Sequence, residues 1–207
     1  VYVTEDLKYI FSGHILDTEK KTSITEPAIK LLQERDVERQ AKAAVAMRDS
    51  IKTMLVANQD NFIKEVKGTG KDILYMVTDA ECGFCKAMDK NLEQLTDITI
   101  YRIPVAFLGP KSEQIANAAL CAKDRLETWK NLTTKKVSID KDAACASPLE
   151  ANGALMASWK VRSTPTLFRA DGERWSEGLI SAEITKIFLA QGAYAAAQAK
   201  GKNVPSK

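Results

Sequence analysis

A Cys-x-x-Cys pair between a strand and a helix constrains this chain more than any other feature. The residues before it, Ile73-Leu74-Tyr75-Met76-Val77, form an apolar run typical of a buried strand. After Cys82-Gly83-Phe84-Cys85, apolar residues recur at helical spacing, at Phe84, Met88, Leu92 and Leu95. The first turn of a helix has unpaired N–H groups and partial positive charge, which favour a thiolate. We therefore expect Cys82 at the exposed lip as the attacking thiol and Cys85, one turn deeper, as the resolving thiol.

Length and composition describe an ordinary globular protein. With 207 residues, 45% hydrophobic and 28% charged, the chain is expected to form one domain plus an appendage, or two small domains. The formal charge of +3 gives no argument for nucleic-acid binding, and no stretch has the length of a membrane span. No signal peptide is visible, so an exported protein would be present here in a processed or recombinant form. Four cysteines, which is an even number, suit two bridges in an oxidising compartment.

The N-terminal third is predicted to be a small β segment followed by a long helix. Residues 1–17 read as a two-stranded hairpin, within an N-terminal β segment at 1–24. A lone hairpin is marginal in water, so it packs either on its own globule or on a second copy of the chain. Thr25-Glu26-Pro27 is typical of a helix start. The helical pattern of apolar residues that follows weakens at 57–60, resumes at Phe62 and ends at Gly68-Thr69-Gly70. We expect a linker helix over 25–67 and a domain boundary at residue 68.

The remaining residues are predicted to form a mixed α/β domain over 68–194. Strand 72–78, helix 83–95 and strand 98–105 form a βαβ unit with parallel strands, and a helical insertion follows at about 108–161. Ser112 is expected to cap the first helix of that insertion. Asp171-Gly172 predicts an antiparallel hairpin, and Ser181 opens a last helix. The tail, 195–207, is expected to be flexible. This order, with Cys-x-x-Cys opening the first helix, resembles the thioredoxin plan.

Two other roles for the cysteines are disfavoured by the sequence. A zinc site needs two more ligands, but the single histidine, His14, lies in the N-terminal segment and Cys121 and Cys145 are far apart in the chain. An inert structural bridge is disfavoured because two intervening residues at a helix start make a strained, reducible disulfide. We therefore expect no metal and no cofactor.

Ser163-Thr164-Pro165-Thr166 is the second diagnostic stretch. Trans is the default for an X-Pro bond, but in thioredoxin folds a cis-proline faces the dithiol at this place in the chain. There the backbone of Thr164 would pair with an extended substrate strand, and Pro165 would close the site against Cys82. We expect Gly83 and Phe84 to contact substrate as well.

The chain resembles the bacterial periplasmic DsbC/DsbG thiol:disulfide interchange family, and DsbC more than DsbG. The residues that carry the resemblance are Val3-Thr4-Glu5-Asp6, Lys8, Gly13, Val77-Thr78-Asp79, Cys82-Gly83-Phe84-Cys85, Cys121-Ala122-Lys123-Asp124, Cys145 and Ser163-Thr164-Pro165. The resemblance implies a homodimer made by an N-terminal domain, a linker helix and a thioredoxin domain with a helical insertion. It also implies that Cys82 is the nucleophile, Cys85 the resolving thiol, Pro165 a cis-proline, and Cys121–Cys145 a structural disulfide.

The chain departs from the family pattern in two places. The family's N-terminal domain has a further stretch before the hairpin, and the linker at residues 26–67 is longer than in DsbC. Because of the first departure, whether this chain forms the family's homodimer is left undecided by the sequence. Gly83-Phe84 resembles the Gly-Tyr of DsbC, and not the Pro-Tyr of DsbG.

The sequence is therefore interpreted as a disulfide isomerase or reductase that acts on misoxidised exported proteins. Cys82 attacks a wrong disulfide, another substrate thiol or Cys85 resolves the intermediate, and a membrane thiol reductant (DsbD-like) restores the dithiol. The alternatives are a net thiol oxidase, and a chaperone-like client-binding protein in which the cysteines are secondary. The location implied by the resemblance is the periplasm, with a signal peptide not present in this chain.

Overall fold

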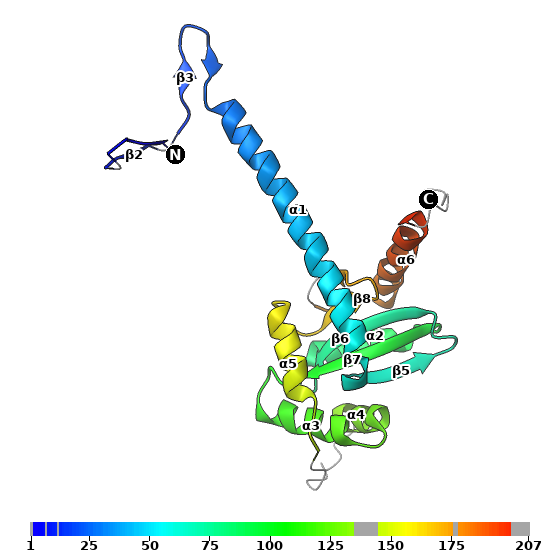
Figure 1. Ribbon diagram of the computed structural model, residues 1–207. Helices are drawn as coiled ribbons and strands as arrows, with labels where there is room; N and C mark the ends of the chain where they lie inside the picture. Colours follow the sequence, from blue (N-terminus) through cyan, green and yellow to red (C-terminus); the bar gives the residue numbers. More distant parts are fainter. Residues whose placement is uncertain (1, 7, 12, 135–144, 176–177, 200–207) are drawn as a thin grey trace. The chain divides into compact units, whose positions relative to one another are not determined.

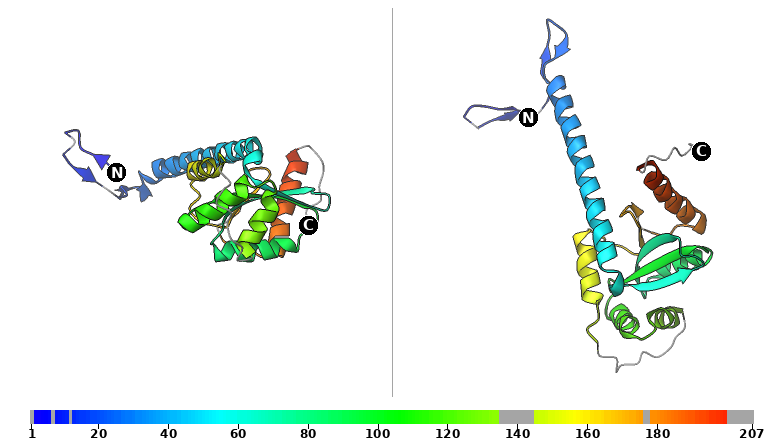
Figure 2. Two further views of the ribbon diagram at one scale, coloured as in Figure 1. Left: turned by 90° about the horizontal axis from the view of Figure 1, so that it is seen from below. Right: turned by 45° about the vertical axis from the view of Figure 1, so that its right-hand side comes forward.

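The computed structural model describes residues 2–6, 8–11, 13–134, 145–175 and 178–199 (Figure 1). The chain divides into two compact units, residues 1–46 and 47–207. The described strands of the first unit are β1 (Tyr2–Val3), β2 (Ile10–Phe11), β3 (Leu16–Asp17) and β4 (Thr22–Ser23). They form two separate antiparallel ribbons, β1 with β2 and β3 with β4, which Figure 2 shows from two further sides.

The prediction of a single hairpin over residues 1–17 is therefore wrong. The side chain of Asp17 accepts hydrogen bonds from the backbone N–H groups of Glu19 (3.0 Å) and Lys20 (2.9 Å). These bonds form a tight turn after β3, and Lys21 completes the turn with a φ of 51°. The chain consequently turns back and pairs with itself a second time.

The long helix α1 runs from Glu26 to Ala57, beginning directly after Thr25 as predicted. It does not continue to residue 67. A short 3-10 turn, η1 (Gln59–Asn61), follows it, and Ile63–Lys67 form the strand β5. The predicted boundary at residue 68 is also wrong, because β5 pairs with β7 and because Ile51 and Leu55 of α1 are buried in the core of the second unit.

The second unit is built on a five-stranded mixed sheet of order β5-β7-β6-β8-β9. The strands after β5 are β6 (Asp72–Asp79), β7 (Ile98–Val105), β8 (Thr166–Arg169) and β9 (Arg174–Trp175). The predicted βαβ unit is confirmed, since β6 and β7 are parallel and paired over their full lengths. The Asp-Gly hairpin is confirmed too, since β8 and β9 are antiparallel.

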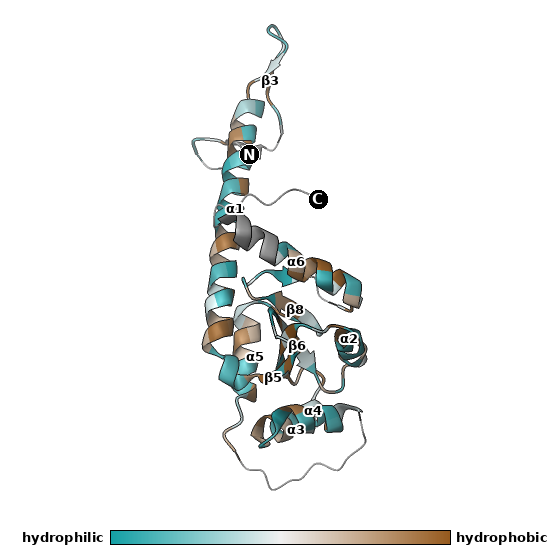
Figure 3. Cartoon of the chain, turned by 90° about the vertical axis from the view of Figure 1, so that its right-hand side faces the viewer, coloured by the Kyte–Doolittle hydropathy of each residue, from teal (hydrophilic) through white to brown (hydrophobic). Residues whose placement is uncertain are grey.

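Helices cover both faces of this sheet. They are α2 (Gly83–Glu93), α3 (Pro110–Cys121), α4 (Arg125–Thr134), α5 (Leu149–Ser158) and α6 (Ala182–Ala199). Figure 3 shows α5 on one side of β6 and β8, and α2 with α6 on the other. Alternate β6 residues face these two layers, Tyr75 and Val77 towards α5, Leu74 and Met76 towards α2 and α6.

Two details of the helices differ from the predictions. Helix α3 begins at Pro110, so Ser112 lies inside it and is not its cap. Helix α6 continues to Ala199 and so includes the first residues of the tail that was expected to be flexible; residues 200–207 lie outside the described part of the chain. Ser181 does open α6, since its hydroxyl accepts a hydrogen bond from the N–H of Ile184 (3.2 Å). No helix in the described ranges has the length and apolarity needed to cross a membrane.

Candidate active site

The Cys-x-x-Cys pair lies where β6 ends and α2 begins. Cys82 is the N-cap residue of α2, with extended backbone angles, and its sulfur accepts a hydrogen bond from the N–H of Cys85 (3.2 Å). Sulfur thus takes the place that a serine or aspartate oxygen usually has at a helix start. A negative charge at this atom faces unpaired N–H groups and the positive end of the helix dipole.

Both sulfurs are more enclosed than the sequence predicted. Cys82 is 6% exposed and Cys85 1%, and both belong to the apolar cluster between the sheet and helices α2 and α6. Both are free thiols. The exposed lip expected at Cys82 is formed instead by Gly83 and by Phe84, which is 67% exposed.

The segment before β8, which comes much later in the sequence than the dithiol, places Thr164 and Pro165 beside it. The Thr164–Pro165 peptide bond is cis. The thiol of Cys82 donates a hydrogen bond to the backbone carbonyl of Thr164 at 3.4 Å. The carbonyl of Pro165 is occupied by the N–H of Gly178 (2.9 Å). Residues about 80 positions apart in the sequence therefore meet at one sulfur atom.

The deeper thiol is held in its protonated form. Burial, and then the hydrogen bond with Cys82, raise the pKa of Cys85 to about 12, while the Thr164 side chain acts in the opposite direction. At neutral pH Cys85 is therefore a thiol. A protonated, buried thiol at Cys85 fits a site in which Cys85 reacts only when a disulfide forms beside it.

A buried carboxylate, missed by the sequence interpretation, holds the turn before Cys82. Asp79 is 1% exposed. One of its oxygens accepts hydrogen bonds from the N–H of Glu81 (2.9 Å) and the hydroxyl of Ser112 (2.5 Å), and the other from the N–H of Leu108 (3.0 Å). The turn is thereby tied to the β7–α3 loop and to the first turn of α3. A polar residue at the end of an apolar strand was the only sequence signal.

Cys121 and Cys145 lie away from this turn, at the other end of α3. They form a disulfide with a Cα–Cα distance of 5.7 Å and a sequence separation of 24. Cys121 is the last residue of α3, and Cys145 precedes α5. The bridge therefore closes the insertion, whose residues 135–144 lie outside the described part of the chain.

A buried ionic cluster ties the insertion to the sheet and to α2. Arg102 of β7, whose side chain is 3% exposed, pairs with Glu65 of β5 (2.7 Å) and with Asp89 of α2 (2.9 Å). Lys130 of α4 pairs with Glu65 as well. Burial opposes ionisation of Glu65, but Arg102 and Lys130 lower its pKa, whereas burial raises the pKa of Asp89 despite Arg102. Since the cations and anions balance, the cluster is suited to structure and not to holding a ligand.

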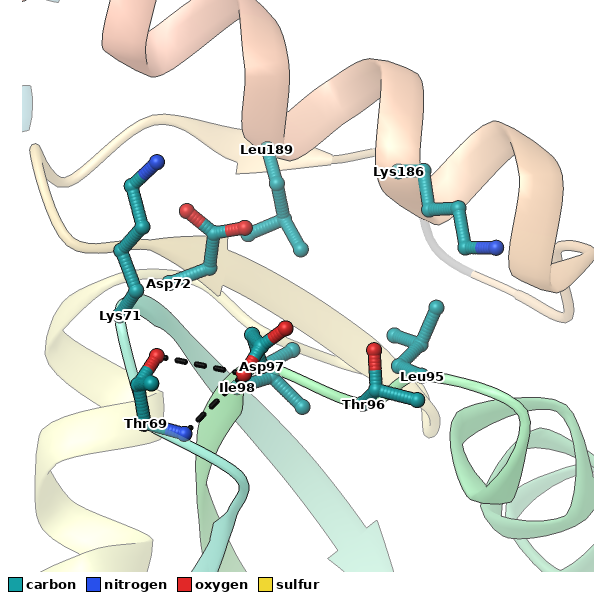
Figure 4. Close-up of a pocket in the computed structure, with 9 residues that line it drawn as sticks. All are labelled: Thr69, Lys71, Asp72, Leu95, Thr96, Asp97, Ile98, Lys186 and Leu189. Atoms are coloured by element: carbon teal, nitrogen blue, oxygen red, sulfur yellow. Dashed lines mark hydrogen bonds between the residues drawn. The ribbon is translucent and has the colours of Figure 1, made fainter.

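The described residues of this unit offer no metal site, and they contain a hollow away from the dithiol. Within the described ranges, no group of three or more His, Cys, Asp or Glu side chains is arranged to hold a metal ion. A hollow of about 420 Å³ lies at the opposite end of β6 from the dithiol (Figure 4). Of its two carboxylates, Asp72 and Asp97, the second is engaged by the N–H and hydroxyl of Thr69, at 3.1 and 3.3 Å.

The fold and this site define the class of protein. A mixed sheet with helices on both faces carries a Cys-x-x-Cys at a helix start against a cis-proline loop, and the family model described as a thioredoxin-like domain matches residues 59–193. The chain belongs to the thioredoxin-like family.

Within this family the chain is similar to thiol:disulfide interchange proteins. It is 33% identical over 164 residues to the probable thiol:disulfide interchange protein DsbC of Bordetella parapertussis, covering 78% of this chain and 56% of that protein. It is 23% identical to DsbG of Pseudomonas aeruginosa, covering 84% of this chain and 66% of that protein. The chain thus spans little more than half the length of the DsbC relatives that it matches.

Solved structures show the same relationship. A disulfide interchange protein from Neisseria gonorrhoeae superposes with a TM-score of 0.58 at 27% identity, covering 64% of this chain and 96% of that one. Proteus mirabilis ScsC in a transitional conformation superposes with a TM-score of 0.59, covering 81% of this chain and 90% of that one. At 19% identity the second likeness concerns the fold alone.

Proposed function

We propose that this protein is a thiol:disulfide oxidoreductase that reduces or isomerises disulfides in misoxidised proteins. The observation that carries the proposal is the position of the Cys82 sulfur, at the start of α2 and 3.4 Å from the Thr164 carbonyl beside the cis-proline. A sulfur at a helix start, in contact with a backbone carbonyl beside the exposed Gly83 and Phe84, suits attack on a disulfide in a bound polypeptide.

In the proposed reaction the Cys82 thiolate attacks one sulfur of the client disulfide and the other client sulfur leaves as a thiolate. The mixed disulfide then has two fates. A second client thiol displaces Cys82 and the client is isomerised, or Cys85 attacks Cys82, and the client leaves reduced by two electrons while Cys82–Cys85 becomes a disulfide. We assign substrate contacts to Gly83, Phe84 and the backbone of Thr164, with Pro165 closing the site.

The decisive experiment compares two single substitutions in refolding of scrambled ribonuclease and in oxidation of reduced ribonuclease. Cys82→Ser is expected to abolish both activities, because no nucleophile remains. Cys85→Ser is expected to accumulate a client joined to Cys82, visible on a non-reducing gel, because the internal escape is lost. Equal activity of Cys82→Ser and the unchanged protein would overturn the proposal. Faster oxidation of reduced than refolding of scrambled ribonuclease would favour the alternative, a net thiol oxidase.

The cellular location of the protein, its reductant and the roles of its segments are also part of the proposal. The relatives' names and the disulfide between Cys121 and Cys145 support an oxidising location, the bacterial periplasm. A membrane thiol reductant of the DsbD kind would return Cys82 and Cys85 to thiols. The division of labour would be a dimerisation segment in residues 1–24, a linker in α1, and catalysis in the thioredoxin-like part.

A chaperone-like activity is proposed as a secondary function, because Phe84 exposes 67% of its surface beside the dithiol. A variant with both Cys82→Ala and Cys85→Ala is expected to retain suppression of aggregation of a reduced client, measured by light scattering. Loss of suppression in that variant would show that client binding depends on the mixed disulfide alone.

A further inference from the structure

One residue outside the Cys-x-x-Cys pair is in contact with both of its cysteines. The backbone carbonyl of Asp79 accepts a hydrogen bond from the N–H of Cys82 at 3.1 Å. Burial raises the pKa of Cys85 to about 12, and a hydrogen bond with the backbone of Asp79 acts in the opposite direction. The last residue of β6 therefore contacts both cysteines through its main chain.

The side chain of Asp79 fixes that main chain in place. Its two oxygens accept three hydrogen bonds, from the N–H groups of Glu81 (2.9 Å) and Leu108 (3.0 Å) and from the hydroxyl of Ser112 (2.5 Å). An ionised carboxylate satisfies all three donors because it only accepts. An amide in its place would turn an NH2 group towards one of the two backbone N–H groups, which cannot accept. The site therefore requires the negative charge of aspartate as well as its shape.

This negative charge is not balanced by a cation. Asp79 is 1% exposed, and among the described residues no Lys, Arg or His forms an ion pair with it. The charged neighbours at this edge, Glu81 and Lys111, pair with each other at 2.7 Å, and Lys86 of α2 also attracts the Glu81 carboxylate. Water and salt screen a buried charge much less than an exposed one. The start of α2 therefore experiences the Asp79 carboxylate as an unpaired anion.

An anion at this position disfavours a second negative charge on Cys82. The start of α2 favours the Cys82 thiolate, through the N–H of Cys85 and the helix dipole. A thiolate stabilises only the reduced form, so a nearby anion shifts the equilibrium from the dithiol towards the disulfide. A dithiol that is less stable relative to its disulfide is the stronger reductant, and the proposed reduction of clients uses this property.

We propose that Asp79 is a positioning residue for the redox reaction, which holds both cysteines through its main chain and keeps the dithiol reducing through its buried charge. The inference rests on the proposed function and deepens it, because it assigns the reducing strength of the site to a residue outside the Cys-x-x-Cys pair.

The test measures the equilibrium of the full chain with glutathione. The Cys82–Cys85 dithiol and glutathione disulfide give the Cys82–Cys85 disulfide and two glutathione thiols, so two electrons and two protons leave the protein. Alkylation followed by mass spectrometry gives the reduced fraction. Asp79→Asn removes the charge and keeps the shape. It is expected to shift the equilibrium towards the dithiol by about three- to tenfold, the upper value corresponding to about 30 mV in reduction potential.

Two control variants separate the charge from the hydrogen bonds. Glu81→Gln removes an equal charge next to Cys82, but this carboxylate is partly exposed and paired with Lys111, so a shift below about twofold is expected. Ser112→Ala removes one hydrogen bond of Asp79 and leaves its charge, so it should lower the melting temperature without shifting the glutathione equilibrium. Asp79→Ser, in which water can replace the lost acceptors, is the second variant without the charge and should act in the same direction as Asp79→Asn.

The inference is overturned if Asp79→Asn leaves the equilibrium unchanged or moves it towards the disulfide. It is overturned as well if Glu81→Gln or Ser112→Ala shifts the equilibrium as far as Asp79→Asn does. If neither Asp79→Asn nor Asp79→Ser melts cooperatively, Asp79 serves the fold alone and the assignment is wrong. Each of these results leaves the proposed function standing. An unchanged protein that forms no Cys82–Cys85 disulfide with glutathione disulfide would instead remove the proposed function, and this inference with it.

Discussion

Cys82 and Cys85 are one helical turn apart and have different chemical surroundings. Cys82 caps α2 and reaches the Thr164 carbonyl, whereas Cys85 is 1% exposed within an apolar cluster. A buried sulfur without a nearby cation is costly to ionise. The proposed order of the two chemical steps therefore follows from where each sulfur lies.

This difference predicts how the second step depends on pH. Because burial raises the pKa of Cys85 to about 12, its thiolate fraction increases about tenfold for each pH unit between 6 and 9. Release of a small thiol from a mixed disulfide with Cys82 should accelerate by the same factor, measured by stopped-flow absorbance. The same mixed disulfide on Cys85→Ser should release thiol only when free thiol is added. A rate that levels off near neutral pH would instead show that another group accepts the Cys85 proton.

Sequence reasoning located the reactive residues but not the residue that positions them. Cys82 and Cys85 were found from their spacing and from the apolar patterns on either side. Asp79 was missed because its partners Leu108 and Ser112 come from residues about 30 positions further along, and no periodic pattern marks such a contact. The burial of Cys82 was also missed, because it involves residues distant in the sequence, among them Thr164 and the apolar residues of β6 and α6.

At the scale of elements, the β8–β9 turn and helix α1 approach so closely that only glycine fits between them. Gly172 has a φ of +84°, and a Cβ added there would clash with the backbone carbonyl of Arg48 in α1. The turn residue was predicted from the Asp171-Gly172 pair. Its contact with a helix more than 100 residues earlier was not, since a turn signal carries no information about what packs on it.

Gly172→Ala is expected to lower the free energy of unfolding by about 2 kcal/mol or more, through the positive φ and the clash together. Urea denaturation followed by fluorescence of the tryptophans measures the change. Gly153→Ala is the matched control: Gly153 lies within α5 with open space around the added Cβ, so a gain of about 0.5–1 kcal/mol is expected. Equal effects of the two substitutions would contradict the predicted clash.

The strand β5 shows why one element could not be recognised. In Ile63–Lys67 the charged Glu65 points inward and the apolar Val66 is 55% exposed, so the alternation of hydrophobicity that marks a strand is disturbed. Glu65 tolerates burial because Arg102 and Lys130 pair with it. By contrast β6 contains the continuous apolar run Ile73–Val77 and was predicted from it, and β7 was predicted as the second strand of the βαβ unit.

At the scale of the whole molecule, the first unit carries exposed apolar residues that its own chain does not cover. On α1 these include Leu31 (57%), Leu32 (58%), Val37 (67%) and Val45 (49%). The two short ribbons before α1 have two strands each, and a two-stranded ribbon is marginally stable alone in water. Both features support the proposed homodimer.

Sedimentation equilibrium is expected to give a mass of about 46 kDa, twice the 22.8 kDa of one chain. Replacing Leu31 and Leu32 by Lys should shift the mass towards that of the monomer, because burial of their side chains would then require desolvation of two charges. A monomer at micromolar concentration for the unchanged chain would contradict the homodimer and leave the redox site unaffected. Sequence reasoning could not choose between packing on the chain's own globule and packing on a second copy, since an exposed apolar stripe has the same pattern whichever surface covers it.

The disulfide of the insertion has a consequence for how this protein matures. Cys121 and Cys145 follow one another among the cysteines of the chain, and Cys82 and Cys85 do so before them. In the proposed export the chain would emerge N-terminus first, and Cys145 would be the next cysteine to appear after Cys121, so no later cysteine competes for this pair. Pairing of consecutive cysteines thus reduces the need for disulfide isomerisation while this protein folds, which is the reaction that it is proposed to catalyse in other proteins.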